Sequence, residues 1–214
     1  MRIQAWLQHQ WTYGCMVTAL LWLLAATSSS ARVDLPLDQI YFHSAVSHGG
    51  RGCPQEARVE ATLGDDGRSV HLAFEPYQVQ VSPDTTPVTR TTCLVSLPLR
   101  IPSGWQYTVL AANTHRTLGL ETGVRAHHLI EIYFQGEPGF ELVEYYQGPL
   151  LSGDSTDQTT EMSNAGPVWS RCHSQRNLNV RTVLYVSNRD NRDGSGRLAI
   201  QSPAVYTLDW RPCE

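Results

Sequence analysis

Residues 178–186 read Leu-Asn-Val-Arg-Thr-Val-Leu-Tyr-Val, and this stretch indicates the fold class. Every second side chain is apolar or small, which is the pattern of a β-strand with one buried face. The residues expected to point inward are Leu178, Val180, Thr182, Leu184 and Val186. Residues 126–135 repeat the pattern, with Ala126, His128, Ile130, Ile132 and Phe134 on the inner side. A third such strand is predicted from Ser69 onward, with Val70, Leu72 and Phe74 sharing a face.

Further strands are predicted over residues 39–43, 58–63, 77–81, 93–100, 106–113, 140–146, 197–201 and 205–210. Runs rich in Gly, Pro, Asn and Asp separate them, and helical periodicity is not evident. The prediction is therefore an all-β fold, a single antiparallel β-sandwich or jelly-roll-like domain. Residues 147–167 are rich in Ser, Thr, Asp, Gly and Gln and are expected to form a long loop. Such a loop can be functional or a simple surface excursion.

The first 31 residues have the pattern of a secretory signal peptide. Arg2 precedes an apolar stretch of about a dozen residues, shorter than the ~20 that a membrane-spanning helix needs. Small residues then lead to Ala31, where cleavage is expected. We therefore predict a signal peptide over residues 1–31 and a secreted, extracellular domain over residues 32–214, without membrane insertion.

Four cysteines follow the predicted leader: Cys53, Cys93, Cys172 and Cys213. Four cysteines allow three pairings. The pairing Cys53–Cys93 with Cys172–Cys213 is favoured, because each bond then encloses its own run of strands. A metal site is disfavoured because no CxxC or CxxxC spacing occurs.

Charge and composition exclude several classes of function. The formal net charge is −4, without blocks of like charge, so nothing indicates binding to nucleic acid. All 16 basic residues are arginine, and a chain without lysine cannot use Schiff-base chemistry. Nucleophile elbows and phosphate-binding glycine loops are missing from the sequence. No cofactor is expected.

Several short motifs spread along the chain carry a family resemblance. They are Gly52-Cys53-Pro54, Ile101-Pro102, Gly104-Trp105, Tyr133-Phe134-Gln135-Gly136, Gly148-Pro149, Val168-Trp169-Ser170-Arg171-Cys172, Arg176-Asn177-Leu178-Asn179-Val180, and Trp210 with Cys213. Over essentially the whole mature chain, they resemble the secreted proteins of fungi and bacteria grouped as domain of unknown function 4360. The resemblance implies secretion and a β-rich fold. It implies no catalytic residue, because that family has no agreed activity.

Aromatic residues are the first candidates for ligand binding, because aromatic rings stack on the C–H faces of sugars. The candidates are Trp105, Tyr107, Tyr145 and Tyr146. The alternative role is packing in the core, which is favoured most for Trp169 and Trp210 because each lies near a cysteine, and also, by less, for Trp105 and the pair Tyr145–Tyr146.

Glutamates supply the candidates for catalysis. Glycoside hydrolysis needs two carboxyl groups that face each other, and Glu131, Glu141 and Glu144 lie on consecutive predicted strands. In a hairpin, Glu131 would lie near Glu141 or Glu144 on the exposed face. Acidic residues at alternate positions are also ordinary on a solvated sheet.

Two acidic stretches are candidates for calcium. Asp154 and Asp157 lie with Glu161 in the predicted loop, and Asp190 and Asp193 lie in a run of Asn and Asp ahead of Gly194. Asn/Asp/Gly runs are also the ordinary chemistry of hairpin turns, and a turn is favoured over a calcium site. His127 and His128 point to opposite faces of a strand, so they cannot bind one metal ion together.

The sequence thus favours a secreted, non-catalytic protein that binds polysaccharide or a cell-wall glycan. A carbohydrate-active hydrolase or lyase that uses paired glutamates stays open as an alternative. A secreted effector that binds an unknown protein partner is the third.

Overall fold

The computed structural model describes residues 34–161 and 167–214, with the backbone alone for residues 151–161. The chain divides into two units, Met1–Asp34 and Leu35–Glu214, and only the second is described below. The predicted signal peptide over residues 1–31 lies outside the described residues. Within them, no helix is long and apolar enough to cross a membrane.

One short 3₁₀ helix, η1 (Leu37–Gln39), precedes the strands. The described strands are β1 (Tyr41–Phe42), β2 (Ser47–Gly49), β3 (Val59–Leu63), β4 (Ser69–Phe74), β5 (Tyr77–Val81), β6 (Val88–Leu97), β7 (Leu99–Arg100), β8 (Trp105–Leu120), β9 (Arg125–Phe134), β10 (Phe140–Gln147), β11 (Leu150–Glu161), β12 (Leu178–Ser187) and β13 (Gly196–Pro212).

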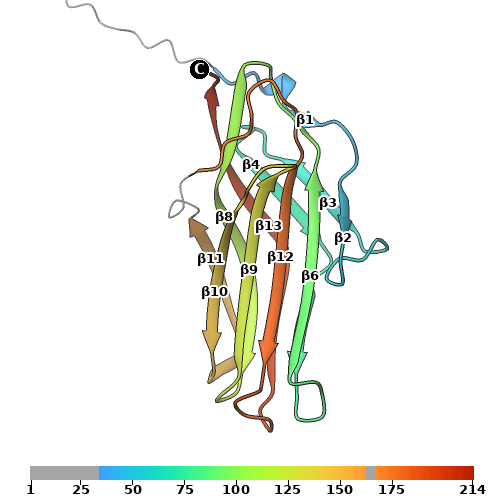
Figure 1. Ribbon diagram of the computed structural model, residues 1–214, viewed down its shortest axis with the longest axis vertical. Helices are drawn as coiled ribbons and strands as arrows, with labels where there is room; N and C mark the ends of the chain where they lie inside the picture. The colour runs from blue at the N-terminus through green and yellow to red at the C-terminus, as the bar shows by residue number, and fades with distance from the viewer. Residues whose placement is uncertain (1–33, 162–166) are drawn as a thin grey trace, which may run out of the picture. The chain divides into compact units, whose positions relative to one another are not determined.

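The strands form two layers, as Figure 1 shows. One sheet has the order β10-β9-β12-β6-β2, and it lies in front in that view. The other has the order β11-β8-β13-β4-β3, with β5 also paired to β13, and β1 pairs with β7 separately. Neighbouring strands are antiparallel throughout the described pairings. The predicted antiparallel β-sandwich is confirmed.

The core lies between the sheets and follows the period-two pattern of the sequence. On β12 the predicted inner residues Leu178, Val180, Leu184 and Val186 are buried at 1% exposure or less. On β9 the inner residues alternate with half-buried outer ones, so His127 and His128 point to opposite faces as predicted. The six-stranded sheet contributes buried residues that include Val70, Leu72, Val109, Leu118, Leu198, Ile200 and Leu208.

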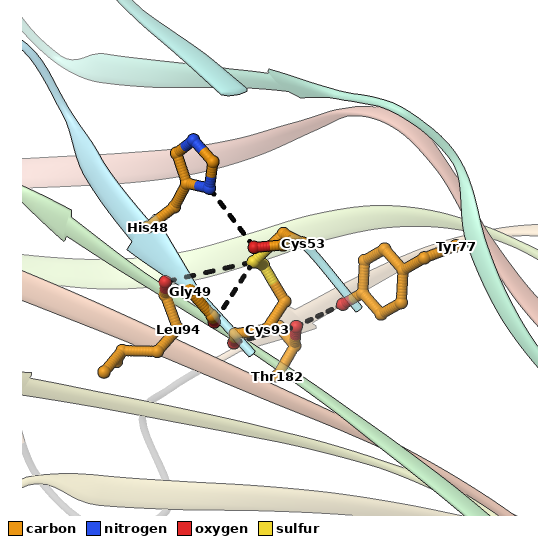
Figure 2. Close-up of a disulfide and its surroundings, with 7 residues drawn as sticks. All are labelled: His48, Gly49, Cys53, Tyr77, Cys93, Leu94 and Thr182. Carbon is orange, nitrogen blue, oxygen red and sulfur yellow. Dashed lines mark hydrogen bonds between the residues drawn. A yellow bond between two sulfur atoms is a disulfide. The ribbon is translucent and has the colours of Figure 1, made fainter. Parts of the chain in front are cut away.

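Both predicted disulfides are present, Cys53–Cys93 and Cys172–Cys213. The first is buried beside β12, as the close-up in Figure 2 shows. There Thr182 donates a hydrogen bond to the Cys93 carbonyl oxygen at 3.5 Å and contacts the Tyr77 hydroxyl group. Tyr77 lies on β5 and Thr182 on β12, so this hydrogen-bond chain joins the two sheets next to the disulfide.

The structure adds the short strand β2, extends β8 to Leu120 beyond the predicted residues 106–113, and corrects the strand prediction in two further places. Residues 150–161 form strand β11 at the edge of the six-stranded sheet, where a long loop was expected. A polar sequence can pair there because an edge strand needs only its backbone groups on one side. The segments predicted separately over residues 197–201 and 205–210 belong to one strand, β13, whose register shifts between Gln201 and Val205.

Candidate functional site

A row of aromatic side chains crosses the outer face of the five-stranded sheet. The pairing registers place Tyr145 opposite His127, His127 opposite Tyr185, and Tyr185 opposite Arg90. These residues come from the adjacent strands β10, β9, β12 and β6. Neighbouring strands are about 4.8 Å apart, so the three rings span about 10 Å and Arg90 extends the line to about 14 Å. We call Tyr145, His127 and Tyr185 the aromatic row, which Arg90 continues.

The rings of the aromatic row contact one another. The ring centroids of His127 and Tyr185 are 4.4 Å apart and their planes differ by 12°, which is a stacked arrangement. The ring of Tyr145 is tilted by 57° to His127 at 5.8 Å. Tyr145 is 78% exposed, whereas His127 and Tyr185 are half-buried. Burial, together with the positive charge of Arg90, lowers the pKa of His127 below its usual value of 6.5. The rings of the row are thus held by their neighbours, and Tyr145 is the one most accessible to a ligand.

A hollow of about 840 Å³ adjoins the aromatic row. The three rings line it together with residues at the ends of β9, β10 and β12. Those other lining residues are Arg125, Ala126, Tyr146, Gln147, Ser187, Arg189 and Asp190. Arg125 and Asp190 form an exposed ion pair at 2.9 Å. The hollow combines stacking surfaces with hydrogen-bonding groups, which is the composition of a small-ligand site.

Next to the aromatic row lies a parallel row of apolar residues, Val143, Leu129 and Val183. Val183 is 1% exposed although it lies on the outer face of the sheet. Val183 is thus covered by its neighbours, and the apolar surface accessible beside the rings comes from the half-buried Leu129 and Val143.

The predicted pair of glutamates lies farther along the same sheet face. Glu131 and Glu141 are direct cross-strand partners, so these two carboxylates are neighbours as predicted. Arg181 of β12 lies on the other side of Glu131 and forms an ion pair with it. The two acids thus lie side by side on one sheet surface, with an arginine bound to one of them. Glycoside hydrolysis instead requires carboxyl groups on either side of the scissile bond.

Glu144 does not lie on the exposed face with Glu131, contrary to the prediction. It is three residues from Glu141 and so points to the opposite, inner side of β10. There it forms an ion pair with Arg116 of β8, whose side chain is fully buried. The Tyr146 hydroxyl group donates to Glu144 at 3.0 Å and also contacts the Arg116 guanidinium group. Glu144 is thus part of a polar cluster between the sheets.

His128 completes this inner cluster. Its Nδ1 lies 3.8 Å from the Glu144 carboxylate, and neither ring nitrogen has a hydrogen-bond partner among the described residues. Burial lowers the pKa of His128 to about 3, with further contributions from the positive charges of Arg116 and His127. The Glu144 carboxylate does not raise the pKa of His128 back to its usual value. Its charge is paired with the guanidinium group of Arg116, which lies closer to Glu144 than the His128 ring does. The His128 imidazole is therefore neutral at physiological pH.

The other predicted aromatic residues lie apart from the aromatic row. Tyr107, on β8, is 1% exposed and stacks on Trp210 with centroids 5.1 Å apart, so it is a core residue and not a surface ligand site. Trp105 is half-buried at the start of β8, on the other sheet. Trp210 is 7% exposed, in agreement with the predicted packing role. Trp169 lies half-buried under the guanidinium group of Arg211, at 4.0 Å.

The residues considered for calcium have other surroundings. The backbone of Asp154 and Asp157 pairs with β8 as part of β11, so they are not in a loop, and their side chains lie outside the described part. Asp190 is bound to Arg125, and Asp193 is exposed. Asn188 accepts a hydrogen bond from Arg192 at 3.0 Å and donates one to the Gly194 carbonyl oxygen at 2.9 Å, which are contacts of a turn. No group of three or more His, Cys, Asp or Glu side chains converges in the described residues.

Sequence reasoning named Tyr145 but missed His127, Tyr185 and Arg90. Tyr146, which it also named, lines the hollow, but its hydroxyl group contacts Glu144 and Arg116 between the sheets. The available signal was strand parity, which places His127 and Tyr185 on the outer face opposite the apolar stripes. Their alignment depends on the register between β9 and β12 and between β12 and β6, strands far apart in the chain. The register therefore had to come from the structure.

A second hollow, of about 990 Å³, lies at the turns before β9, after β10 and before β13. None of the described residues that line it is aromatic, and its charged side chains are Glu121 and Arg197. Glu121 already accepts a hydrogen bond from the Ser195 backbone at 2.7 Å. This hollow lacks the stacking surface that the aromatic row provides.

Comparison with known proteins gives one family and several distant likenesses. The profile of a family described as "Domain of unknown function (DUF4360)" matches residues 42–213. An "Uncharacterized secreted protein" of Arthroderma benhamiae is 28% identical over 179 residues, which cover 78% of this chain and 70% of that protein.

Among solved structures, TmCBM61 in complex with β-1,4-galactotriose is similar with a TM-score of 0.32 and 10% identity. The likeness covers 79% of this chain and 89% of that one. A family 11 carbohydrate-binding module from Clostridium thermocellum, in complex with a β-1,3-1,4-mixed-linked tetrasaccharide, has a TM-score of 0.28 and 11% identity. There the coverage is 78% of this chain and 94% of that one.

Proposed function

This chain belongs to the DUF4360 family, and from that premise we propose that it is a secreted protein that binds polysaccharide through the aromatic row. The observation that carries the proposal is the alignment of Tyr145, His127 and Tyr185 on three adjacent strands of one sheet face. Tyr145 is 78% exposed and lies beside two further rings, and a contiguous group of exposed or half-exposed rings, unlike a single one, is a feature of binding surfaces.

The geometry of the row suits a polysaccharide. The sheet holds the three rings through the backbone pairing of β9, β10 and β12, so ordering them on binding costs little conformational entropy. Leu129 and Val143 beside them add half-buried apolar surface, and the exposed Gln147 and Arg189 offer hydrogen bonds around the hollow. A chain of sugar rings can use both kinds of contact.

The protein is proposed to act outside the cell. Two disulfides within a domain of this size fit an oxidising compartment, and the relative from Arthroderma benhamiae is named as secreted. Residues 1–31 would then be removed as a signal peptide. Mass spectrometry of the protein recovered from culture medium tests this step, because the proposal requires a mature chain that begins near Arg32.

A binding assay on glycans tests the main proposal. Purified, oxidised protein would be applied to an array of plant, fungal and bacterial polysaccharides. We expect Tyr145→Ala to weaken the binding found there by about tenfold or more, since a stacked aromatic side chain is lost. Tyr41→Ala is the matched control, because Tyr41 is 51% exposed but lies on β1, in a separate two-stranded sheet.

Two outcomes would contradict the proposal. One is an array without a bound glycan although the protein is folded. The other is binding that Tyr145→Ala and Tyr41→Ala leave equally strong, because the ligand would then lie elsewhere on the molecule.

A further inference from the structure

We infer that the polysaccharide bound by the aromatic row is acidic, and that arginines beside the row bind its carboxylate or sulfate groups. This inference rests on the proposed function and names the ligand class of that same site. It comes from the distribution of charge over the outer face of the five-stranded sheet.

Positive charge is concentrated around the aromatic row. Arg90 continues the row on β6, and Arg125 and Arg189 line the hollow beside it. The one described acidic residue that lines the hollow is Asp190, and Arg125 is bound to it. Three arginines thus face one carboxylate, in a chain whose formal net charge is −4. The local charge is opposite in sign to that of the whole protein.

The other acidic residues of this sheet face do not cancel that charge. Glu131 and Glu141 lie four residues along their strands from His127 and Tyr145, which is roughly 13 Å at the rise of a β-strand. Glu131 is also bound to Arg181. Because charges separated by more than about 8 Å are largely screened at physiological ionic strength, these glutamates leave the field at the row positive.

Arg90 is free to bind a ligand. It is exposed, and no acidic side chain of the described residues forms an ion pair with it. It acts on the row all the same, since its positive charge contributes to the lowered pKa of His127. A guanidinium group presents a planar pair of donors that matches a carboxylate or a sulfate group.

Acidic sugars combine the two features that the site requires. A uronate ring keeps an apolar C–H face, which can stack on a tyrosine, and carries its carboxylate at the ring edge. Arg90 lies directly opposite Tyr185 on the next strand, about 4.8 Å away, so a carboxylate of a sugar bound at this end of the row would lie beside its guanidinium group. A neutral sugar would use the rings and leave the guanidinium group without a partner.

Calorimetric titration with matched ligands tests the inference. The ligands are an oligogalacturonate, its methyl ester, which has the same rings without the charge, and sulfated dextran. We expect the wild-type protein to bind the acid about tenfold or more tightly than the ester, as for hydrogen bonds between charged groups. Arg90→Gln and Arg189→Gln should each weaken binding of the acid several-fold and leave the ester unaffected. Arg100→Gln is the control, because Arg100 is exposed on β7.

The outcomes separate this inference from the proposed function. Equal affinity for acid and ester, with both affinities lost in Tyr145→Ala, overturns the acidic ligand but supports the row as a glycan site. The inference is also overturned if the protein prefers the acid to the ester and Arg90→Gln and Arg189→Gln do not change this preference. If the wild-type protein prefers sulfated dextran to the other two ligands, and Arg90→Gln and Arg189→Gln abolish this preference, the inference is supported. Sulfate esters are then the source of the negative charge. Failure of all three ligands to bind contradicts it.

Discussion

Arg116 on β8 and Glu144 on β10 form an ion pair between the two sheets of the sandwich, with the arginine side chain fully buried and the glutamate side chain 14% exposed. Each strand belongs to a different sheet, so the pair joins the layers near one edge. The aromatic row lies on the other face of β10. The ion pair between Arg116 and Glu144 therefore anchors β10, which is the strand that carries Tyr145.

Removal of one partner of this pair should be costly. Arg116→Met leaves the Glu144 carboxylate in the interior without its cation, and we expect a loss of about 3–5 kcal/mol in the free energy of unfolding. The double variant Arg116→Met/Glu144→Leu should recover most of that loss because no buried charge remains. Urea denaturation measures both. A single variant as stable as the wild-type protein would show that the pair is not buried as described.

Acidic pH should destabilise the protein through His128. The imidazole of the unfolded chain takes up a proton below about pH 6.5, whereas in the folded protein the pKa of His128 is lowered to about 3. Between these values the unfolded state binds more protons, so the free energy of unfolding falls as the pH falls, by at most about 1.4 kcal/mol per pH unit for this group.

A pH series of denaturation curves on His128→Leu checks this contribution. We expect the dependence between pH 6 and pH 4 to be shallower in His128→Leu than in the wild-type protein. His43→Gln is the control, since His43 is exposed. Identical pH dependence in the wild-type protein and His128→Leu would contradict a neutral, buried His128.

The two disulfides should contribute unequally. They enclose loops of similar length, with sequence separations of 40 and 41, so loop entropy assigns each about 4 kcal/mol. Cys53 and Cys93 are 2% and 4% exposed, whereas Cys172 and Cys213 are half-buried. Replacement of the first pair by alanine should therefore cost more, since it also leaves a cavity in the core. Thermal unfolding of the two double variants measures the difference, and a larger loss for the second pair would contradict it.

Most of the fold could be predicted because alternation marks a strand with one buried face. It works for residues 178–186 because four of the five inner side chains are apolar, whereas Asn179 and Arg181 interrupt the apolar residues on the outer side. It fails for β11, whose polar sequence shows no such contrast. The alternation pattern also predicts two strands separated at Pro203. In the structure the register shifts between Gln201 and Val205, and β13 continues through Pro203 as one strand.

The candidate site was predictable only in part, for a physical reason. Tyr145 could be identified as exposed from its strand alone. Its association with His127 follows from a hairpin, but Tyr185 and Arg90 join the row through pairings between strands distant in sequence. A shift of one residue in either register would move these side chains to the other face. Tyr107 could not be separated from the binding candidates because nothing local in the sequence shows that it packs against Trp210.

The most direct measurement of the central claim is a titration of ¹⁵N-labelled protein with a glycan that the array identifies, followed by amide chemical shifts. The account predicts that the shifts concentrate at Tyr145, His127, Tyr185 and Arg90 and at the neighbouring hollow, with the six-stranded sheet unchanged. Shifts centred instead on residues 119–122 and 195–197 of the second hollow, or on Trp105 and Trp169, would contradict the aromatic row as the binding site.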